Sequence, residues 1–140
     1  MRNLQYLFLA AVTIAAATAA LAADIKVIAN SSVGASAVSA DELKGVFLGT
    51  KTSLGDGSHV EPVLLKSGAV HEAFLKEYVG KTDDALNTYY RSLVFTGKGS
   101  MPKAFASDAE VVSFVEKTKG AIGYVSAGAS AGSAKTLEVK

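Results

Sequence analysis

Residues 60–80 constrain the fold more than any other part of the chain, because they predict a strand that turns directly into a helix. Residues 63–65 form a short apolar run of the kind found in buried strands. Ser67 can cap a helix that begins at once, and Gly80 can end that helix in a left-handed conformation. The stretch therefore predicts a sheet whose strands are connected by helices.

The start of this helix is also the first candidate for a binding site. A helix that begins at Ser67 leaves its first amide N–H groups without carbonyl partners, and the aligned peptide dipoles add partial positive charge there. Such a helix end suits an anion. The alternative is that Ser67 only caps the helix and that water fills the remaining space. Arg91 could pair with an anion, although an arginine on a helix surface is more often solvated.

Strand and helix signals alternate along the rest of the chain. Residues 25–29 alternate and are β-branched, and residues 121–125 are typical of a strand that tolerates a glycine, which predicts two further strands. Capping-box patterns that begin at Ser39 and Ser107 predict two helix starts. Residues 136–139 are suited to an edge strand. This order predicts an α/β domain in which helices cover a small, mixed or parallel sheet.

The first 22 residues predict a secretory signal peptide. Arg2 precedes a long apolar run, which ends in a small-x-small cleavage pattern at residues 20–22. The run is almost long enough to span a bilayer, so a membrane anchor is the competing interpretation. Its alanine content and the adjacent cleavage pattern favour removal. We therefore expect a periplasmic or secreted protein that consists of one domain, residues 23–140, with no membrane insertion after cleavage.

Charge and composition argue against several classes of function. The chain carries 14 Lys and Arg against 13 Asp and Glu, so it lacks the basic footprint of a nucleic-acid-binding protein. It contains no Cys, and His59 and His71 have neither metal-ligand spacing nor a nucleophile elbow near them. We therefore predict a protein that is not an enzyme and that uses no cofactor or metal.

Several short motifs, in this order, resemble those of one known family. They are the strand at residues 25–30, the helix and turn at residues 39–49, Gly55-Asp56-Gly57, Ser67-Gly68, Phe95-Thr96-Gly97 and residues 120–124. On these motifs the chain is similar to small periplasmic-binding-protein-like components of phosphate ABC transporters, and specifically to the second lobe of phosphate-binding proteins. The resemblance implies a single lobe of the type II periplasmic-binding-protein fold.

The resemblance also implies a ligand site. In that family an oxyanion is held by backbone amides and hydroxyls at helix starts, which line a cleft between two lobes. By position, this assigns oxyanion binding to Ser67, Gly68 and Ala69, and to Asn30 and Ser31 after the first strand.

The chain departs from the family's binding turn, which commonly reads Ser-Gly-Thr-Arg. Ala69 and Val70 replace the hydroxyl and the guanidinium, and the first lobe is absent. A small hydrated anion must exchange most of its hydration shell for converging donors before it binds tightly. We therefore expect binding of phosphate or another oxyanion that is weak or depends on a partner chain.

The alternative to solute binding is a protein–protein interaction or assembly module of the cell envelope with no small ligand. In this interpretation an envelope protein, or a second copy of the chain, covers apolar residues that the missing lobe leaves open.

Overall fold

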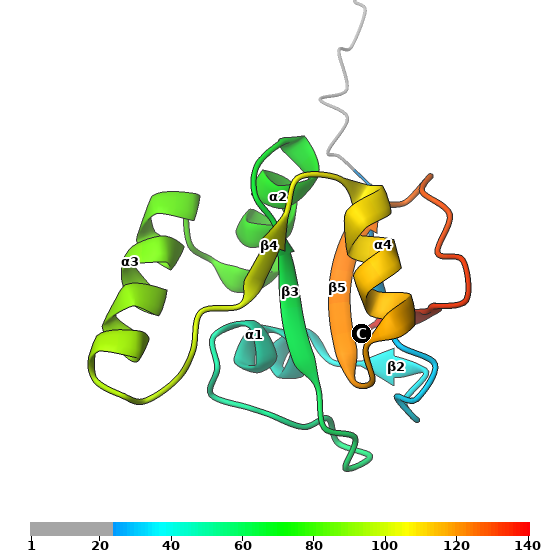
Figure 1. The fold of residues 1–140 in the computed structure, drawn as a ribbon, viewed down its shortest axis with the longest axis horizontal. Coiled ribbons are helices and arrows are strands. Elements are labelled where there is room, and N and C mark those ends of the chain that lie inside the picture. The colour runs from blue at the N-terminus through cyan, green and yellow to red at the C-terminus, as the bar shows by residue number, and fades with distance from the viewer. Residues whose placement is uncertain (1–23) are drawn as a thin grey trace, which may run out of the picture.

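Six strands form one mixed sheet within residues 24–140, the part of the chain that the computed structural model describes (Figure 1). The predicted signal peptide, residues 1–22, lies outside the described residues. The strands are β1 (Ile25–Ala29), β2 (Ala37–Val38), β3 (Glu61–Leu65), β4 (Lys103–Phe105), β5 (Ala121–Ser126) and β6 (Lys135–Val139). The helices are α1 (Ala40–Phe47), α2 (Ala69–Phe74), the π-helix η1 (Leu75–Val79), α3 (Asp83–Phe95) and α4 (Asp108–Lys117).

The strand directions define two ends of the sheet. The strand order is β2-β6-β1-β5-β3-β4. β3 runs parallel to β4 and β5, whereas β1 runs antiparallel to β5 and β6. β3, β4 and β5 therefore finish at the same end, which we call the carboxyl end of the sheet. The opposite end, where these three strands begin, is called the amino end.

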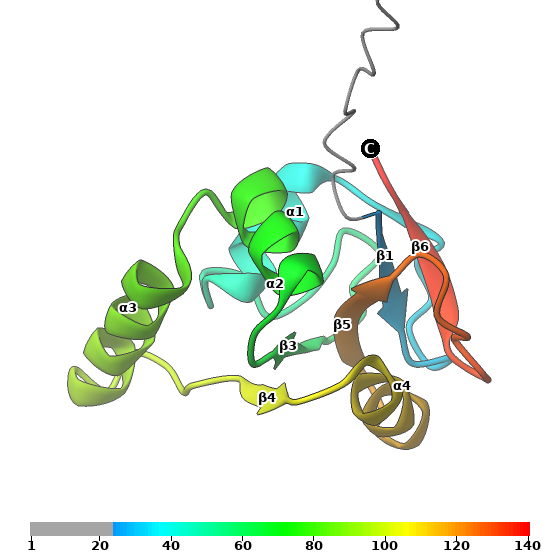
Figure 2. The ribbon, with the colours of Figure 1, turned by 90° about the horizontal axis from the view of Figure 1, so that it is seen from above.

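Helices cover both faces of the sheet, as Figure 2 shows. The chain leaves β3 toward the face that carries α1 and α2, and it leaves β4 toward the face that carries α4. Two adjacent parallel strands that lead into helices on opposite faces form a topological switch point, and ligands of open α/β sheets bind beside such points. α3 stands to one side of the sheet, beyond β4.

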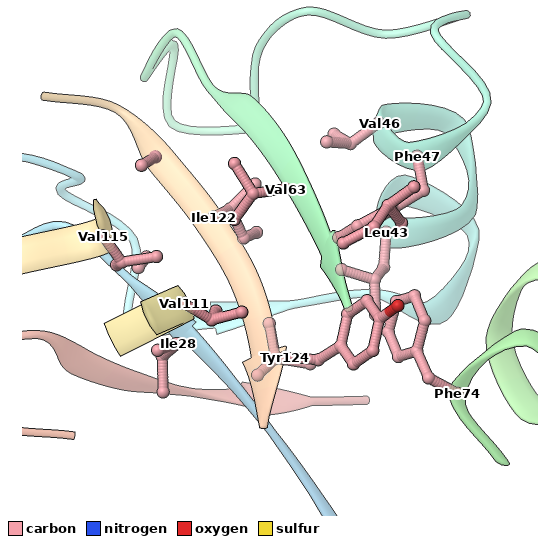
Figure 3. Packing of buried hydrophobic residues seen from close by; sticks show 14 of the residues in the cluster. Ile28, Leu43, Val46, Phe47, Val63, Phe74, Val111, Val115, Ile122 and Tyr124 are labelled. Carbon is pink, nitrogen blue, oxygen red and sulfur yellow. The ribbon is translucent and has the colours of Figure 1, made fainter. Parts of the chain in front are cut away.

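The core lies on both faces of β5, whose first five residues are buried. Figure 3 shows Tyr124 of β5 beside Phe74 of α2 on one face, while Val111 of α4 packs on the other. A Cβ on Gly123 would lie 3.0 Å from the Val111 Cγ1 atom, so the glycine permits α4 to pack closely on the strand. No helix within residues 24–140 is long and apolar enough to cross a membrane.

The predicted fold class and most helix starts are confirmed. The first strand occupies residues 25–29, as predicted. The Ser39 hydroxyl accepts a hydrogen bond from the Glu42 amide, and the Ser107 hydroxyl accepts one from the Glu110 amide. Gly80 is left-handed, with φ 74°, as predicted for the end of the helix.

Three details of the secondary structure differ from the prediction. The helix after β3 begins at Ala69 with Gly68 as its N-cap, and it widens into η1 before Gly80. β6 is not an edge strand, because it pairs with both β1 and β2. β2 and β4 were not predicted, since runs of two and three residues carry no periodicity.

Candidate binding site

Residues 66–68 connect β3 to α2 at the carboxyl end of the sheet, and with Ala69 they form an exposed turn. The Lys66 amide donates to the carbonyl oxygen of Phe105, the last residue of β4, over 2.8 Å. Gly68 has φ 104° and ψ 172°, a backbone conformation that only glycine adopts without strain. The turn is therefore fixed at one side by β4 and in the middle by glycine.

The start of α2 has no side-chain cap among the described residues. The prediction that Ser67 caps the helix is wrong, because the N-cap position falls one residue later, on Gly68, which has no side chain. The first helical hydrogen bond runs from the Glu72 amide to the Gly68 carbonyl oxygen, at 3.0 Å. The amides of the first turn therefore have no carbonyl partner in the helix and can donate to an anion.

The neighbouring helix start, that of α4, differs because it is capped by Ser107 and carries carboxylates that accept hydrogen bonds from nearby groups. The Glu110 carboxylate accepts from the Ala106 amide at 2.9 Å. The Asp108 carboxylate accepts from the Ser126 hydroxyl at 2.7 Å and from the Ser126 amide at 3.3 Å. These two carboxylates also place negative charge at this end of the sheet. The start of α4, which is capped by the Ser107 hydroxyl and carries two carboxylates, therefore suits an anion less than the start of α2 does.

Asn30 and Ser31 lie at the amino end of the sheet, away from the turn that carries Ser67. β1 runs antiparallel to β5, so its last residues pair with the first residues of β5. The Asn30 amide donates to the carbonyl oxygen of Ala121 over 2.8 Å. The structure therefore brings together Ser67, Gly68 and Ala69 but places the other two predicted residues elsewhere.

The side chain of Asn30 is engaged within the protein. It is 6% exposed, and its amide nitrogen donates to the carbonyl oxygens of Val115 at 2.8 Å and Glu116 at 3.0 Å. Its Oδ1 atom accepts from the Ser32 amide at 2.9 Å. These bonds tie the last turns of α4 to the end of β1, which gives Asn30 a structural role.

A buried polar network begins two residues beyond the exposed turn. His71, on α2, is 2% exposed. Its Nε2 atom lies 2.7 Å from the Asp83 Oδ1 atom at the start of α3, and its Nδ1 atom contacts the Tyr124 hydroxyl. The same hydroxyl accepts from the Leu65 amide over 3.2 Å. The network therefore joins the end of β3 to α2, α3 and β5.

One proton arrangement satisfies every group in this network. Because the Leu65 amide donates to the Tyr124 oxygen, the tyrosine O–H can donate to His71 Nδ1, and the Nε2–H then donates to the Asp83 carboxylate. Burial raises the pKa of Tyr124, so its hydroxyl keeps its proton at neutral pH. His71 and Tyr124 are both buried, so they support the turn and offer no accessible nucleophile.

Aromatic packing supports the same region. The rings of Phe74 and Tyr124 stack with centroids 3.8 Å apart, and Phe47 meets Phe74 edge-on at 4.8 Å (Figure 3). Sequence reasoning did not find the partners of His71, because Asp83 and Tyr124 are 12 and 53 residues away along the chain. No short-range pattern signals such a contact.

A pocket of about 590 Å³ lies between η1 and the start of α3, away from the turn at residues 66–69. It includes the acidic residues Glu72, Asp83 and Asp84 together with Lys76 and Lys81. This mixed charge favours an anion less than the uncapped start of α2 does. No group of three or more His, Asp or Glu side chains within residues 24–140 is placed to hold a metal ion.

The fold is similar to that of solved phosphate-binding proteins. An ABC-type phosphate transport receptor from Vibrio cholerae matches with a TM-score of 0.58 at 15% identity, over 83% of this chain and 46% of that chain. A phosphate ABC transporter substrate-binding protein from Clostridium perfringens, solved with bound phosphate, matches with a TM-score of 0.60 at 18% identity, over 83% and 44%. PstS from Borrelia burgdorferi matches with a TM-score of 0.62 at 13% identity, over 84% and 47%.

This chain has the fold of one periplasmic-binding-protein lobe. The expected resemblance to phosphate-binding proteins is thereby confirmed for the fold. The chain spans less than half the length of each of these three solved chains. No family model and no curated protein sequence matches it.

Proposed function

We propose that this chain is an exported, non-enzymatic binding lobe that holds phosphate or a related oxyanion at the turn formed by Ser67, Gly68 and Ala69. The observation that carries the proposal is the exposed, uncapped start of α2 directly after β3. Its position at a topological switch point supports it, because such points are where α/β sheets bind ligands. The phosphate bound by the solved protein from Clostridium perfringens supports the choice of ligand class.

The turn offers a fixed set of donors. The first-turn amides of α2 and the exposed Ser67 hydroxyl can donate to oxyanion oxygens, and the helix dipole adds partial positive charge at the same place. The conformation of Gly68 and the hydrogen bond from Lys66 to β4 hold these donors in place before the ligand arrives. Preorganised donors lose less entropy on binding.

One helix start supplies only part of the shell that a hydrated oxyanion needs. Ala69 and Val70 add neither a hydroxyl nor a cation, and the start of α4 presents the carboxylates of Asp108 and Glu110. We therefore infer that the isolated lobe binds weakly and that a second chain supplies the opposite wall of the site. The coverage of less than half of each solved relative is consistent with this incompleteness.

Titration of residues 23–140 with phosphate, followed by calorimetry and by amide chemical shifts in NMR, tests the proposal. We expect weak binding, with an affinity of about millimolar, and shifts centred on residues 67–70. Absence of heat, of shifts and of a melting-temperature change at millimolar phosphate would reject binding by the lobe. Shifts confined to another region would reject this site.

Two glycine substitutions provide a matched pair for the same titration. Gly68→Ala adds a Cβ that meets no atom within 4 Å, so it acts through the positive φ of 104° alone. It should weaken phosphate binding about tenfold, because the turn must change its backbone conformation to relieve strain. Gly128→Ala also meets no atom within 4 Å and has no positive φ. It should leave binding unchanged; an equal response of the two variants would contradict the role of the turn.

A protein–protein interaction module with no small ligand is the second candidate function. The observation in its favour is a set of large apolar side chains that are exposed within residues 24–140, namely Val94, Phe95 and Met101. They lie at the end of α3 and in the loop after it, not beside Ser67. A monodisperse monomer in light scattering, with no envelope protein recovered on cross-linking, would reject this function.

A further inference from the structure

The exposed apolar side chains of the described residues gather at one protruding part of the molecule. Phe95 is 92% exposed, Val94 is 52% exposed and Met101 is 48% exposed. The first two end α3, and Met101 lies in the loop that leads to β4. Figures 1 and 2 show that α3 stands out from the side of the sheet. These apolar side chains are therefore exposed on a part of the molecule that stands out from the body.

Basic residues flank this apolar group, and acidic residues are absent from the same segment. Residues 85–107 contain no Asp or Glu. Arg91 lies one helical turn before Phe95 on the same face of α3, and Lys98 comes three residues after Phe95. The one ion pair within residues 24–140 lies elsewhere, so no carboxylate of the described residues neutralises either cation. We call Arg91, Val94, Phe95, Lys98 and Met101 the α3 tip.

The body of the protein adds no excess negative charge beside the tip. A groove of about 330 Å³ separates the loop after α3 from the body. Met101 lines one side of it, and the charged residues in its lining are Lys51, Glu61 and Lys103. Two cations and one anion give this lining a net positive charge, so it adds to the positive charge of Arg91 and Lys98.

We propose that the α3 tip binds the surface of an anionic lipid bilayer. Phe95, Val94 and Met101 enter the interfacial layer, while Arg91 and Lys98 contact the lipid phosphates. Such binding grows with the buried apolar area and with attraction to anionic lipids. Charge complementarity favours a lipid surface as the partner. Arg91 and Lys98, which form no ion pair among the described residues, lie on either side of the exposed Phe95, and a negatively charged bilayer can contact all three without a shaped pocket.

Sedimentation of residues 23–140 with lipid vesicles tests the proposal directly. Vesicles of mixed phosphatidylglycerol and phosphatidylcholine should bind the protein about tenfold more strongly than vesicles of phosphatidylcholine alone, and added salt should weaken the binding. Equal binding to the two kinds of vesicle, or binding that salt does not change, would overturn the electrostatic part of the proposal. No binding to either would overturn the whole.

Substitutions in the tip separate specific binding from general charge attraction. Phe95→Asp should abolish vesicle binding and should fold normally, because Phe95 is exposed; Phe95→Trp should retain it. Lys98→Glu should weaken binding at least about fivefold. Lys119→Glu, an equal charge change at an exposed position between α4 and β5, should have little effect. Equal losses for the two lysine variants would contradict a role of the tip.

Two further outcomes distinguish this proposal from those above. Light scattering can be combined with the vesicle assay. If the parent protein forms an oligomer that Phe95→Asp converts to a monomer, and if the parent protein does not bind vesicles, the tip contacts a protein partner and the lipid proposal is overturned. The Phe95→Asp variant should keep any phosphate binding, because the turn with Ser67 lies at the other end of the sheet. The vesicle assay and the phosphate titration can therefore reject the lipid proposal and the phosphate proposal separately.

Discussion

The carboxyl end of the sheet and the α3 tip both expose groups that could bind a partner, but the two regions are supported differently. The turn at residues 66–69 is followed on α2 by His71 and Phe74, which are buried and both contact the buried Tyr124. The tip lies beyond the last buried residue of its helix, Tyr90. A fixed backbone turn can present donors in one geometry, whereas exposed side chains on an outlying helix can adapt to a surface.

The hydrogen bonds of α3 show where its support ends. The Tyr89 hydroxyl donates to the Leu48 carbonyl oxygen and the Tyr90 hydroxyl donates to the Phe47 carbonyl oxygen, each at 2.6 Å. Both bonds fasten the middle of α3 to the end of α1. Within the described residues, the last turn of α3, which carries Phe95, makes no side-chain hydrogen bond to the body, and Leu93 is its residue that packs against the core.

The same substitution in the two regions gives the largest expected contrast. Phe74→Ala should lower the free energy of unfolding by about 3–5 kcal/mol, because it leaves a cavity beside Tyr124 and Phe47. Phe95→Ala should change it by less than about 0.5 kcal/mol, because the side chain is exposed. Urea unfolding of the two variants checks this. Similar losses would show that the tip is packed in solution and would remove the contrast.

Alkaline pH should lower the stability of the protein through two buried tyrosines, Tyr124 beside the turn and Tyr90, which anchors the middle of α3. Burial raises the pKa of Tyr124 and of Tyr90 above the ordinary value of 10.0. Above about pH 10 the unfolded chain loses these protons while the folded chain keeps them, so the unfolded state binds fewer protons and stability falls as pH rises. The loss at about pH 11 should be about 1.4 kcal/mol for each tyrosine.

Urea unfolding between about pH 9 and pH 11 measures this dependence. Tyr124→Phe and Tyr90→Phe should each remove about half of the fall expected from these two tyrosines, which assigns a share to each hydroxyl. A stability that stays flat to pH 11 would mean that both hydroxyls ionise as freely in the folded protein as in the unfolded chain.

Substitutions of Asn30 and Ser31 should have a smaller effect on stability, and they test whether the amino end of the sheet takes part in phosphate binding. Asn30→Ala should lower the free energy of unfolding by about 1–3 kcal/mol, because it leaves the Ser32 amide and two carbonyl oxygens of α4 without their partner. Ser31→Ala, at an exposed neighbour, should change it by less than about 0.5 kcal/mol. Phosphate titration of both variants should match that of the parent chain; weaker binding by Ser31→Ala would place part of the site at the amino end.

The features that sequence reasoning predicted correctly depend on neighbouring residues. Ser39 and Ser107 cap their helices through amides three residues ahead, and a local pattern encodes such a bond. The order of strands and helices depends on the same kind of local pattern. The fold class and its resemblance to a binding-protein lobe could therefore be predicted without coordinates.

The features that sequence reasoning missed depend on the tertiary arrangement. Whether Asn30 lies near Ser67 depends on the direction of β1 relative to β3, which no residue of either strand specifies alone. β4 exists because its three residues pair with β3, in the register that places Leu65 opposite Phe105. The N-cap of α2 is Gly68 and not the predicted Ser67, and the positive φ of Gly68 belongs to a turn geometry that the capping pattern does not reveal.

The π-helix η1 carries one more residue in its turn than an α-helix does, as the hydrogen bond from the Gly80 amide to the Leu75 carbonyl oxygen shows, at 2.7 Å. Leu75 and Val79, at the two ends of η1, are both buried. Such a turn is how a helix absorbs an insertion without rotating the next segment of the chain. In this chain the segment therefore holds one residue more than an α-helical turn would, and Asp83 still lies 2.7 Å from His71.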